Sequence, residues 1–207
     1  MSNRYEEKSK KGHGCIGTII AFVLVVAVCV TLLAFSTDVF DGLKDRVSAF
    51  FYPQKYSEFV EKYAEEYGVE ESLVYAVIRT ESGFHEDAES SVGAKGLMQL
   101  MPETFSWLQE KLGDEPMNED ALLNPEINIK YGTFYLSLLL SAYNNNPKTA
   151  VAAYNAGTTV VDKWLSDTTY SDDGLTLKDI PYEETKRHVA RVMQAKSVYE
   201  KLYYGKK

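Results

Sequence analysis

The segment EESLVYAVIRTES, residues 70–82, carries the helical pattern that decides the fold class. Val74, Val77 and Ile78 recur at the i, i+3 and i+4 spacing of one helix face, and Glu81 continues that face at i+7. A carboxylate on a buried stripe is partly desolvated, which favours its protonated form and suits a general acid. Alternatively the helix frays and Glu81 turns to solvent, which is the interpretation that periodicity alone favours.

Helical patterns also occupy most of the chain after residue 55, and no stretch alternates with the period of a strand. Glycine and proline cap signals predict helices over residues 57–67, 70–82, 102–112, from 124–125 onward, from 146–147 to about 154, and 183–203. Residues 162–176 are polar and contain glycine, which predicts a surface loop. The predicted fold class is all-α, around one core.

The N-terminal part of the chain differs sharply in composition. Residues 12–37 contain no Lys, Arg, Asp or Glu, and residues 16–35 are almost wholly apolar. Twenty such residues at about 1.5 Å each cover roughly 30 Å, the thickness of a bilayer core. A cleaved signal peptide has a similar charged front but an apolar region of only about 7–15 residues. We therefore predict a single transmembrane helix over 14–36, a connector over 37–55 and a folded domain over 56–207.

Charge sets the orientation of that helix. Four basic residues precede it and two acidic residues follow it: Arg4, Lys8, Lys10, Lys11, Asp38 and Asp41. The positive-inside rule then places residues 1–13 in the cytoplasm and residues 38–207 outside the cell membrane. The whole chain has a net charge of −8. Residues 1–35 carry +2, so the remaining residues carry −10. So acidic a domain excludes nucleic acid as a partner, and we expect the bilayer to be contacted through the N-terminal helix alone.

The two cysteines, Cys15 and Cys29, lie at or in the membrane segment. The external domain therefore has no disulfide and no thiolate metal site, and we predict no metal and no cofactor.

Two polar islands accompany Glu81. The first, GAKGLMQ over residues 93–99, combines permissive glycines with Gln99, which needs a hydrogen-bond partner if it is buried among its apolar neighbours. The second, AAYNAG over residues 152–157, surrounds Tyr154 and Asn155 with small residues. Either island alone is more often a packed turn, but together with Glu81 they predict a cleft.

Four motifs in order resemble those of the soluble lytic murein transglycosylase (SLT-type) domain: ESGF at 81–84, GLMQLMP at 96–102, NPEINI at 124–129 and AYNAG at 153–157. The match covers residues 56–202. The resemblance implies a mainly helical, lysozyme-like fold with a groove for the alternating GlcNAc–MurNAc strands of bacterial peptidoglycan.

Carried over by position, the resemblance implies that Glu81 is the catalytic acid/base. It also implies that Ser90 helps to position substrate near that carboxylate and that Tyr154 is an active-site tyrosine. The remaining residues implied to bind substrate are Met98, Gln99, Met101 and Asn155.

One position departs from the family pattern. In PYEETKRHV, residues 181–189, His188 stands where the family usually has a tyrosine that hydrogen-bonds the catalytic carboxylate. The ring N–H of His188 can replace that bond, but a protonated ring would favour the charged carboxylate and oppose proton donation. The alternative is a shift of one residue, with His188 on a solvated helix face.

Ordinary glycosidases flank the bond with two carboxylates. Here only Glu81 is a strong candidate, since Glu86, Asp87 and Glu89 lie in a polar loop and are expected to be solvated. The resemblance implies a lytic transglycosylase, which uses one carboxylate to cleave the MurNAc–GlcNAc β-1,4 bond and leaves a 1,6-anhydroMurNAc end. The alternatives are a goose-type lysozyme-like hydrolase and a wall-binding or assembly component with an impaired site, which His188 would explain.

Overall fold

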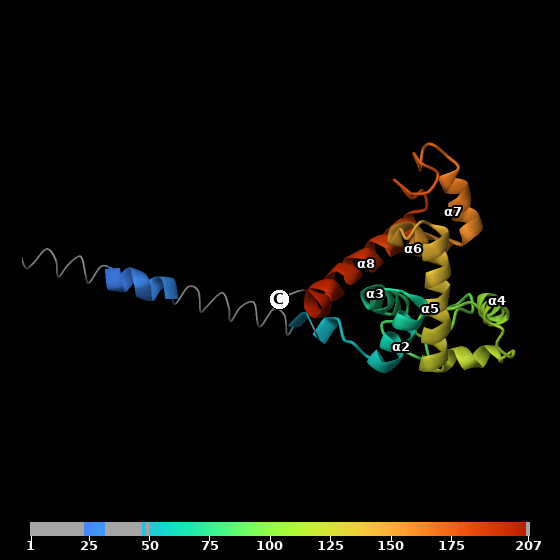
Figure 1. Cartoon of the computed structure of the whole chain (residues 1–207), viewed down its shortest axis with the longest axis horizontal. Helices are drawn as coiled ribbons and strands as arrows, with labels where there is room; N and C mark the ends of the chain where they lie inside the picture. Colours follow the sequence, from blue (N-terminus) through green and yellow to red (C-terminus); the bar gives the residue numbers. More distant parts are fainter. Residues whose placement is uncertain (1–22, 32–46, 49, 206–207) are drawn as a thin grey trace, which may run out of the picture. The chain divides into compact units, whose positions relative to one another are not determined.

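The computed structural model describes residues 23–31, 47–48 and 50–205 of a chain that divides into two units, 1–51 and 52–207 (Figure 1). In the first unit, residues 23–31 are α-helical with every residue exposed. None of the described helices has both the length and the apolar character needed to span a bilayer. Most of the predicted anchor, 14–36, and of the predicted connector, 37–55, lies outside the described residues.

The second unit is helical, and residues 52–205 contain no strand. Its elements follow in the order α2 Ser57–Tyr67, α3 Glu71–Glu81, α4 Pro102–Leu112, η1 Glu119–Leu123, α5 Pro125–Ala142, α6 Pro147–Ala156, α7 Thr158–Leu165, α8 Glu183–Tyr199 and η2 Glu200–Tyr204. Here η1 is a 3-10 helix and η2 a π-helical turn. The predicted all-α class is confirmed for this unit.

The capping residues explain most of the boundaries. Asn124 and Asn146 each accept two backbone N–H bonds at the start of a helix whose first residue is proline. Gly68 and Gly113 end α2 and α4 in the left-handed conformation that glycine tolerates best. The predicted bounds of α2 and α4 are confirmed, and those of α3 were one residue too long at each end.

The loop predicted over residues 162–176 was wrong at its start. The chain turns at Gly157, whose φ is 85°, and re-enters a helix at once as α7. Val161, Trp164 and Leu165 are buried along one side of α7, at the spacing of an amphipathic helix. The polar residues between them face solvent and hid this pattern. The last predicted helix, 183–203, is helical throughout, first as α8 to Tyr199 and then as the π-helical turn η2.

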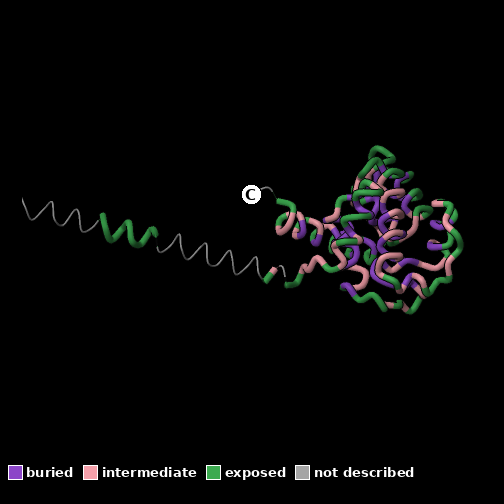
Figure 2. Tube along the Cα trace, turned by 60° about the horizontal axis from the view of Figure 1, so that its bottom comes forward, coloured by how far each residue is buried: buried purple, intermediate pink, exposed green. Residues whose placement is uncertain are grey.

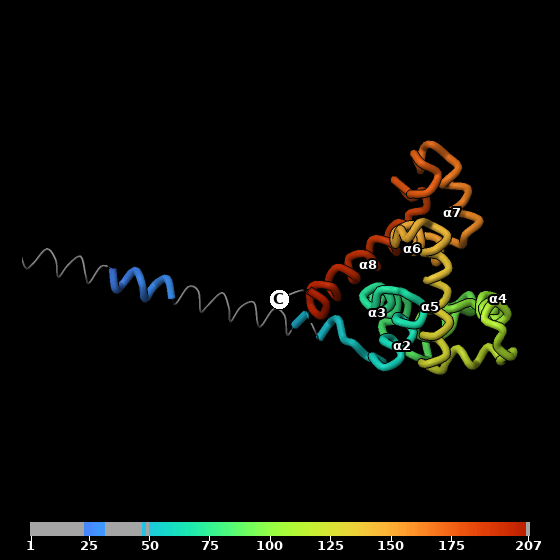
Figure 3. Tube along the Cα trace, in the orientation of Figure 1, coloured from blue at the N-terminus to red at the C-terminus, as the bar shows by residue number. Residues whose placement is uncertain are grey.

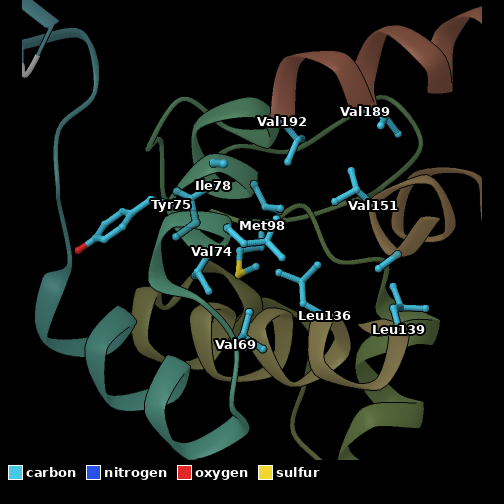
Figure 4. Packing of buried hydrophobic residues seen from close by; sticks show 14 of the residues in the cluster. Val69, Val74, Tyr75, Ile78, Met98, Leu136, Leu139, Val151, Val189 and Val192 are labelled. Atoms are coloured by element: carbon cyan, nitrogen blue, oxygen red, sulfur yellow. The ribbon is translucent and has the colours of Figure 1, made fainter. Parts of the chain in front are cut away.

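The core is built around α3. Every residue of α3 from Ser72 to Ile78 is buried, so this helix is enclosed on all sides rather than along one stripe. It packs against α8 through Val189 and Val192, with Val151 of α6 and Met98 nearby (Figure 4). Figure 2 shows how the buried segments gather in the interior of this unit. Because the rigid centre of the fold ends at Glu81, it fixes the position of that carboxylate.

The two ends of the second unit are joined to each other. The Tyr199 hydroxyl donates to the carbonyl oxygen of Pro53 at 3.0 Å, and the Tyr203 hydroxyl donates to that of Tyr52 at 2.8 Å. The rings of Tyr52 and Tyr199 also meet edge to face. The trace in Figure 3 accordingly returns through α8 to the place where this unit begins.

Candidate active site

Glu81 and His188 form the centre of the candidate site. Glu81 is the last residue of α3, and His188 lies in the second turn of α8. The Nε2 atom of His188 is 2.9 Å from Oε1 of Glu81, and the side chains are only 5% and 16% exposed. The predicted contact is confirmed, and both alternatives that placed these side chains in solvent were wrong. The pairing follows from the packing of α3 along α8.

The other ring nitrogen of His188 restricts how this pair exchanges a proton. Nδ1 is buried and has no hydrogen-bond partner among the described residues. An N–H buried without a partner costs about 1–3 kcal/mol, so the environment favours the neutral tautomer that carries its proton on Nε2. In that state the imidazole donates to an ionised Glu81. A protonated Glu81 either loses this bond or donates to Nε2, which moves the ring proton to Nδ1.

Tyr154 lies on the last turns of α6, close to Glu81. Its hydroxyl donates to the carbonyl oxygen of Met98 at 2.7 Å. Burial raises the pKa of the Tyr154 hydroxyl well above its ordinary value, and the negative charge of Glu81 raises this pKa further. Tyr154 therefore keeps its proton at any physiological pH, and it connects α6 to the loop before α4.

The side chain of Met98 lies in the core. Its side chain is fully buried and packs against Gly132 of α5, where an added Cβ would lie 2.3 Å from the sulfur. The side chain is therefore part of the core, and the prediction that Met98 binds substrate stays a prediction. The apolar flanks of Gln99 that suggested a cleft are partly core residues.

The loop over residues 83–101 holds itself in shape with its own polar side chains. Gln99 has a φ of 50°, and its amide nitrogen donates to the carbonyl oxygens of Ala88 and Gly96 at 3.1 and 2.9 Å. Ser90 Oγ accepts the backbone N–H of Ala94 at 2.9 Å. The partner that Gln99 was predicted to need is thus the backbone. Among the described residues, no hydrogen bond joins Ser90 or Gln99 to Glu81.

Asn128 is a residue of this region to which the sequence analysis assigned no role. It is fully buried on α5, accepts the N–H of Met98 at 2.7 Å, and donates to the carbonyl oxygens of Lys95 and Leu122 at 2.9 and 2.8 Å. It therefore fixes the loop before α4 to both η1 and α5. The sequence did contain a signal for this role, because an asparagine inside a helix with apolar neighbours is expected to be buried, and a buried amide must be hydrogen-bonded.

A cavity of about 540 Å³ lies between the end of α6 and the start of α8. It is lined by Asn155, Ala156 and residues 181–185, so it begins one helical turn before His188 and directly after Tyr154. Asn155 is exposed and faces this space, whereas Met101 is half-buried at the N-cap of α4.

The three acidic residues after Glu81 do not supply a second buried carboxylate. Glu86, Asp87 and Glu89 are all exposed, as predicted, and Glu86 accepts a hydrogen bond from the Tyr56 hydroxyl at 2.8 Å. The arrangement therefore offers one desolvated carboxylate with a histidine partner, and a cavity lies one helical turn before that histidine along α8.

Comparison with known proteins gives a consistent result. The family described as the transglycosylase SLT domain matches residues 58–175. The chain is 32% identical over 169 residues to the soluble lytic murein transglycosylase of Salmonella typhimurium, covering 81% of this chain and 25% of that protein. It is 32% identical over 170 residues to the membrane-bound lytic murein transglycosylase C of Serratia proteamaculans, covering 71% of this chain and 47% of that protein.

Solved structures agree in fold. An inactive mutant of the lytic transglycosylase Slt from Pseudomonas aeruginosa matches with a TM-score of 0.67 and 34% identity, over 75% of this chain and 25% of that one. The 70 kDa soluble lytic transglycosylase from Escherichia coli matches with a TM-score of 0.69 and 29% identity, over 77% and 26%.

The chain spans about a quarter of the length of its first soluble relatives. The family match nevertheless covers more than half of this chain and includes the loop, the α3 carboxylate and the α6 tyrosine described above. On this ground the chain belongs to the transglycosylase SLT family.

Proposed function

We propose that this protein is a membrane-anchored peptidoglycan lytic transglycosylase with Glu81 as its single catalytic carboxylate. The observation that carries the proposal is the desolvated Glu81, whose carboxylate is held 2.9 Å from His188. The exposed state of Glu86, Asp87 and Glu89 supports a mechanism with one carboxylate rather than two. The relatives whose names specify lytic murein transglycosylases support the substrate class.

The proposed reaction uses the same carboxyl group twice. Protonated Glu81 gives its proton to the glycosidic oxygen between MurNAc and GlcNAc, and that bond breaks with positive charge on C1 of MurNAc. The resulting carboxylate takes the proton of the C6 hydroxyl of the same sugar while O6 bonds to C1. The product is a 1,6-anhydroMurNAc end, Glu81 regains its proton, and no water is consumed.

His188 acts as a positioning residue in this cycle. When Glu81 is ionised after the first step, the Nε2–H of His188 donates to it and holds it in place. When Glu81 is protonated, the bond weakens or the ring changes tautomer. His188 therefore holds Glu81 in place in the state in which Glu81 serves as a base.

The remaining predicted residues are proposed to hold the strand. The side-chain nitrogen of Gln99 donates to two carbonyl oxygens of the loop. Its side-chain oxygen accepts no hydrogen bond from the described residues and is therefore available to a sugar amide or hydroxyl. Ser90 Oγ accepts a hydrogen bond from the Ala94 N–H. The hydroxyl proton of Ser90 donates to no acceptor among the described residues, so it is available to a sugar. Asn155 and Met101 are proposed to contact sugars along the cavity and at the start of α4.

The membrane anchor over residues 14–36, with the N-terminus in the cytoplasm, is part of the proposal. The apolar run over 16–35 supports it, as does the helical conformation of residues 23–31 with every side chain exposed. Nine exposed residues of which only one, Thr31, is polar form a surface that water solvates poorly and that lipid would cover.

The activity is tested by mass spectrometry of the products released from purified glycan strands in water enriched in ¹⁸O. We expect 1,6-anhydroMurNAc ends without ¹⁸O from the wild type, and no product from Glu81→Gln, which should still fold and bind strands. Reducing ends that carry ¹⁸O would assign the goose-type hydrolytic reaction instead. If wild type and Glu81→Gln are equally unable to release products, the chain is a wall-binding component and the proposal fails.

A further inference from the structure

A second cavity, of about 210 Å³, lies between α3 and α8 and does not include the catalytic pair. Its lining comes from these two helices and from the first residue of the second unit: Tyr52, Arg79, Thr80, Arg191, Gln194 and Ala195. The lining contains two arginines and no Asp or Glu. A cavity needs only about 10–15 Å³ to hold one water molecule, so this one has room for a larger polar ligand.

Arg79 is held in the cavity wall without a hydrogen-bonding partner for its Nε. This nitrogen is buried and pairs with no acceptor among the described residues, which costs free energy. The guanidinium carbon lies 4.2 Å from the centroid of the Tyr52 ring. The ring covers one face of the guanidinium and leaves the N–H groups along its edge free to donate. Arg79 is thus fixed in place with unused donors.

Arg191 supplies the second positive charge. It is exposed on α8, three residues after His188. The ion pairs in the described part of the chain involve neither arginine, and their basic members are Lys62, Lys95, Lys130, Lys178, Lys186, Lys196 and His188. The chain after residue 35 carries a net charge of −10, so unpaired arginines that share one cavity are unusual in it. Their charges repel each other, and a bound anion would remove this repulsion.

The donors in the cavity indicate the class of anion. The planar fork of arginine matches the oxygens of carboxylate and phosphate groups. The Thr80 hydroxyl donates to the carbonyl oxygen of Ala76 at 2.8 Å, so the donors left for a ligand are the two guanidinium groups and the Gln194 amide. A terminal phosphate has three free oxygens and a charge of about −1.5 to −2 at pH 7, which balances two arginines. A carboxylate offers two oxygens and one charge.

We propose that the cavity between Arg79 and Arg191 is a binding site for a terminal phosphate group, supplied either as free phosphate or by the headgroup of a lipid. The lipid source rests on the proposed membrane anchor, because Tyr52 directly follows the predicted connector, whereas the site itself does not depend on the proposed function. Arg79 is two residues from Glu81, and Arg191 is three from His188. An anion held by both arginines therefore links α3 to α8 about one helical turn from the catalytic pair.

Thermal unfolding of the full chain in a neutral detergent tests the site without any need for turnover. Tm is measured at pH 7 in sodium phosphate and in sodium chloride of equal ionic strength. At several times its Kd, phosphate should raise Tm by about 2–4 °C over chloride. Arg191→Gln, at an exposed position, should lose this gain, and Arg79→Lys, which keeps the charge but not the fork, should reduce it. Arg187→Gln, exposed on α8 but outside the cavity, should keep it.

Phosphate also stabilises folded proteins because it is excluded from their surfaces, so the decisive quantity is the difference between the variants. A gain in Arg191→Gln as large as that in Arg187→Gln would overturn the site, as would equal Tm values of the wild type in the two salts. Sodium acetate of the same ionic strength should give no gain that depends on Arg191. Such a gain from acetate, equal to that from phosphate, would assign the cavity to carboxylates and overturn the phosphate class.

The two sources are distinguished in nanodiscs of phosphatidylcholine with and without phosphatidic acid, the second lipid carrying a terminal phosphate. If the lipid is the ligand, phosphatidic acid should raise Tm in the wild type and in Arg187→Gln but not in Arg191→Gln, and added phosphate should raise it no further. If free phosphate is the ligand, only added phosphate should raise Tm. A Tm that responds to neither overturns the proposal. An enzyme without turnover would refute the proposed function and leave this test unaffected.

Discussion

Replacement of His188 tests the catalytic pair most directly. His188→Gln retains an amide N–H of similar reach, His188→Tyr offers a hydroxyl, and His188→Phe removes the hydrogen bond while it keeps the buried volume. The bond to Glu81 is 2.9 Å long between side chains that are 5% and 16% exposed, so solvent cannot replace it. A hydrogen bond to a charged group is worth about 1.5–3 kcal/mol. Each 1.4 kcal/mol is tenfold, so His188→Phe should lower kcat by roughly 10–150-fold.

Variants that restore a hydrogen bond separate a catalytic contribution from a structural one. His188→Tyr and His188→Gln each keep a donor that can reach Glu81, so both should retain more of the wild-type rate than His188→Phe does.

The assay is the rate of anhydro-product formation between pH 4.5 and 8, with thermal unfolding measured for each variant and Arg187→Gln as an exposed control on the same helix. Equal rates for His188→Phe and wild type would contradict the assigned bond. Rates for His188→Tyr and His188→Gln as low as that of His188→Phe would contradict the role assigned to the hydrogen bond.

Two further predictions concern stability, both measured by thermal unfolding. Gly93→Ala should cost about 1–2 kcal/mol from its left-handed φ of 87° alone, with nothing within 4 Å of the new Cβ. Gly96→Ala should lower the free energy of unfolding by at least about 1–3 kcal/mol more than Gly93→Ala does, because its Cβ would lie 2.2 Å from a backbone oxygen. Equal losses of stability in the two variants would refute the steric argument. The pKa of Asp114 is lowered from 3.8 by the hydrogen bonds it accepts from Lys130 and a tyrosine hydroxyl, so its ionised form stabilises the fold above that pH and the contribution is lost on acidification. Asp114→Asn should therefore lower Tm at pH 7, and lower it less at pH 3. The control Glu115→Gln, at an exposed residue, should change Tm little at either pH. A loss of Tm in Asp114→Asn that is the same at both pH values would contradict the assignment.

The sequence predicted those parts of the fold that local chemistry determines. Asparagine and proline at helix starts, and glycine at helix ends, act through hydrogen bonds and backbone angles within a few residues, so α2 and α4 were placed correctly. The same local reasoning placed the end of α6 near Gly157 but missed α7, which follows it. The backbone angle of Gly157 ends one helix but also permits the next to begin, and only the core contacts of Trp164 make that second helix favourable.

The site was less predictable because it depends on contacts between distant segments. Glu81 and His188 are 107 residues apart, so no periodicity could place the ring against the carboxylate. The resemblance to a family supplied that expectation. Met98 shows a different limit, since membership of a motif does not tell whether a side chain lies on the surface or, as here, in the core. Asn128 was overlooked because its partners are backbone atoms, which carry no sequence signal.

The hydrogen bonds from Tyr199 and Tyr203 to the backbone at Pro53 and Tyr52 make the second unit a closed module. Its entry and exit points are neighbours, and the bonds recognise carbonyl groups rather than particular side chains. Such a module can be attached to different flanking sequences with little change to its interior. The soluble relatives, in which the matched region makes up a quarter of a much longer chain, are consistent with this portability. The same folded unit can thus be joined to different flanking segments at one point of attachment, next to Tyr52.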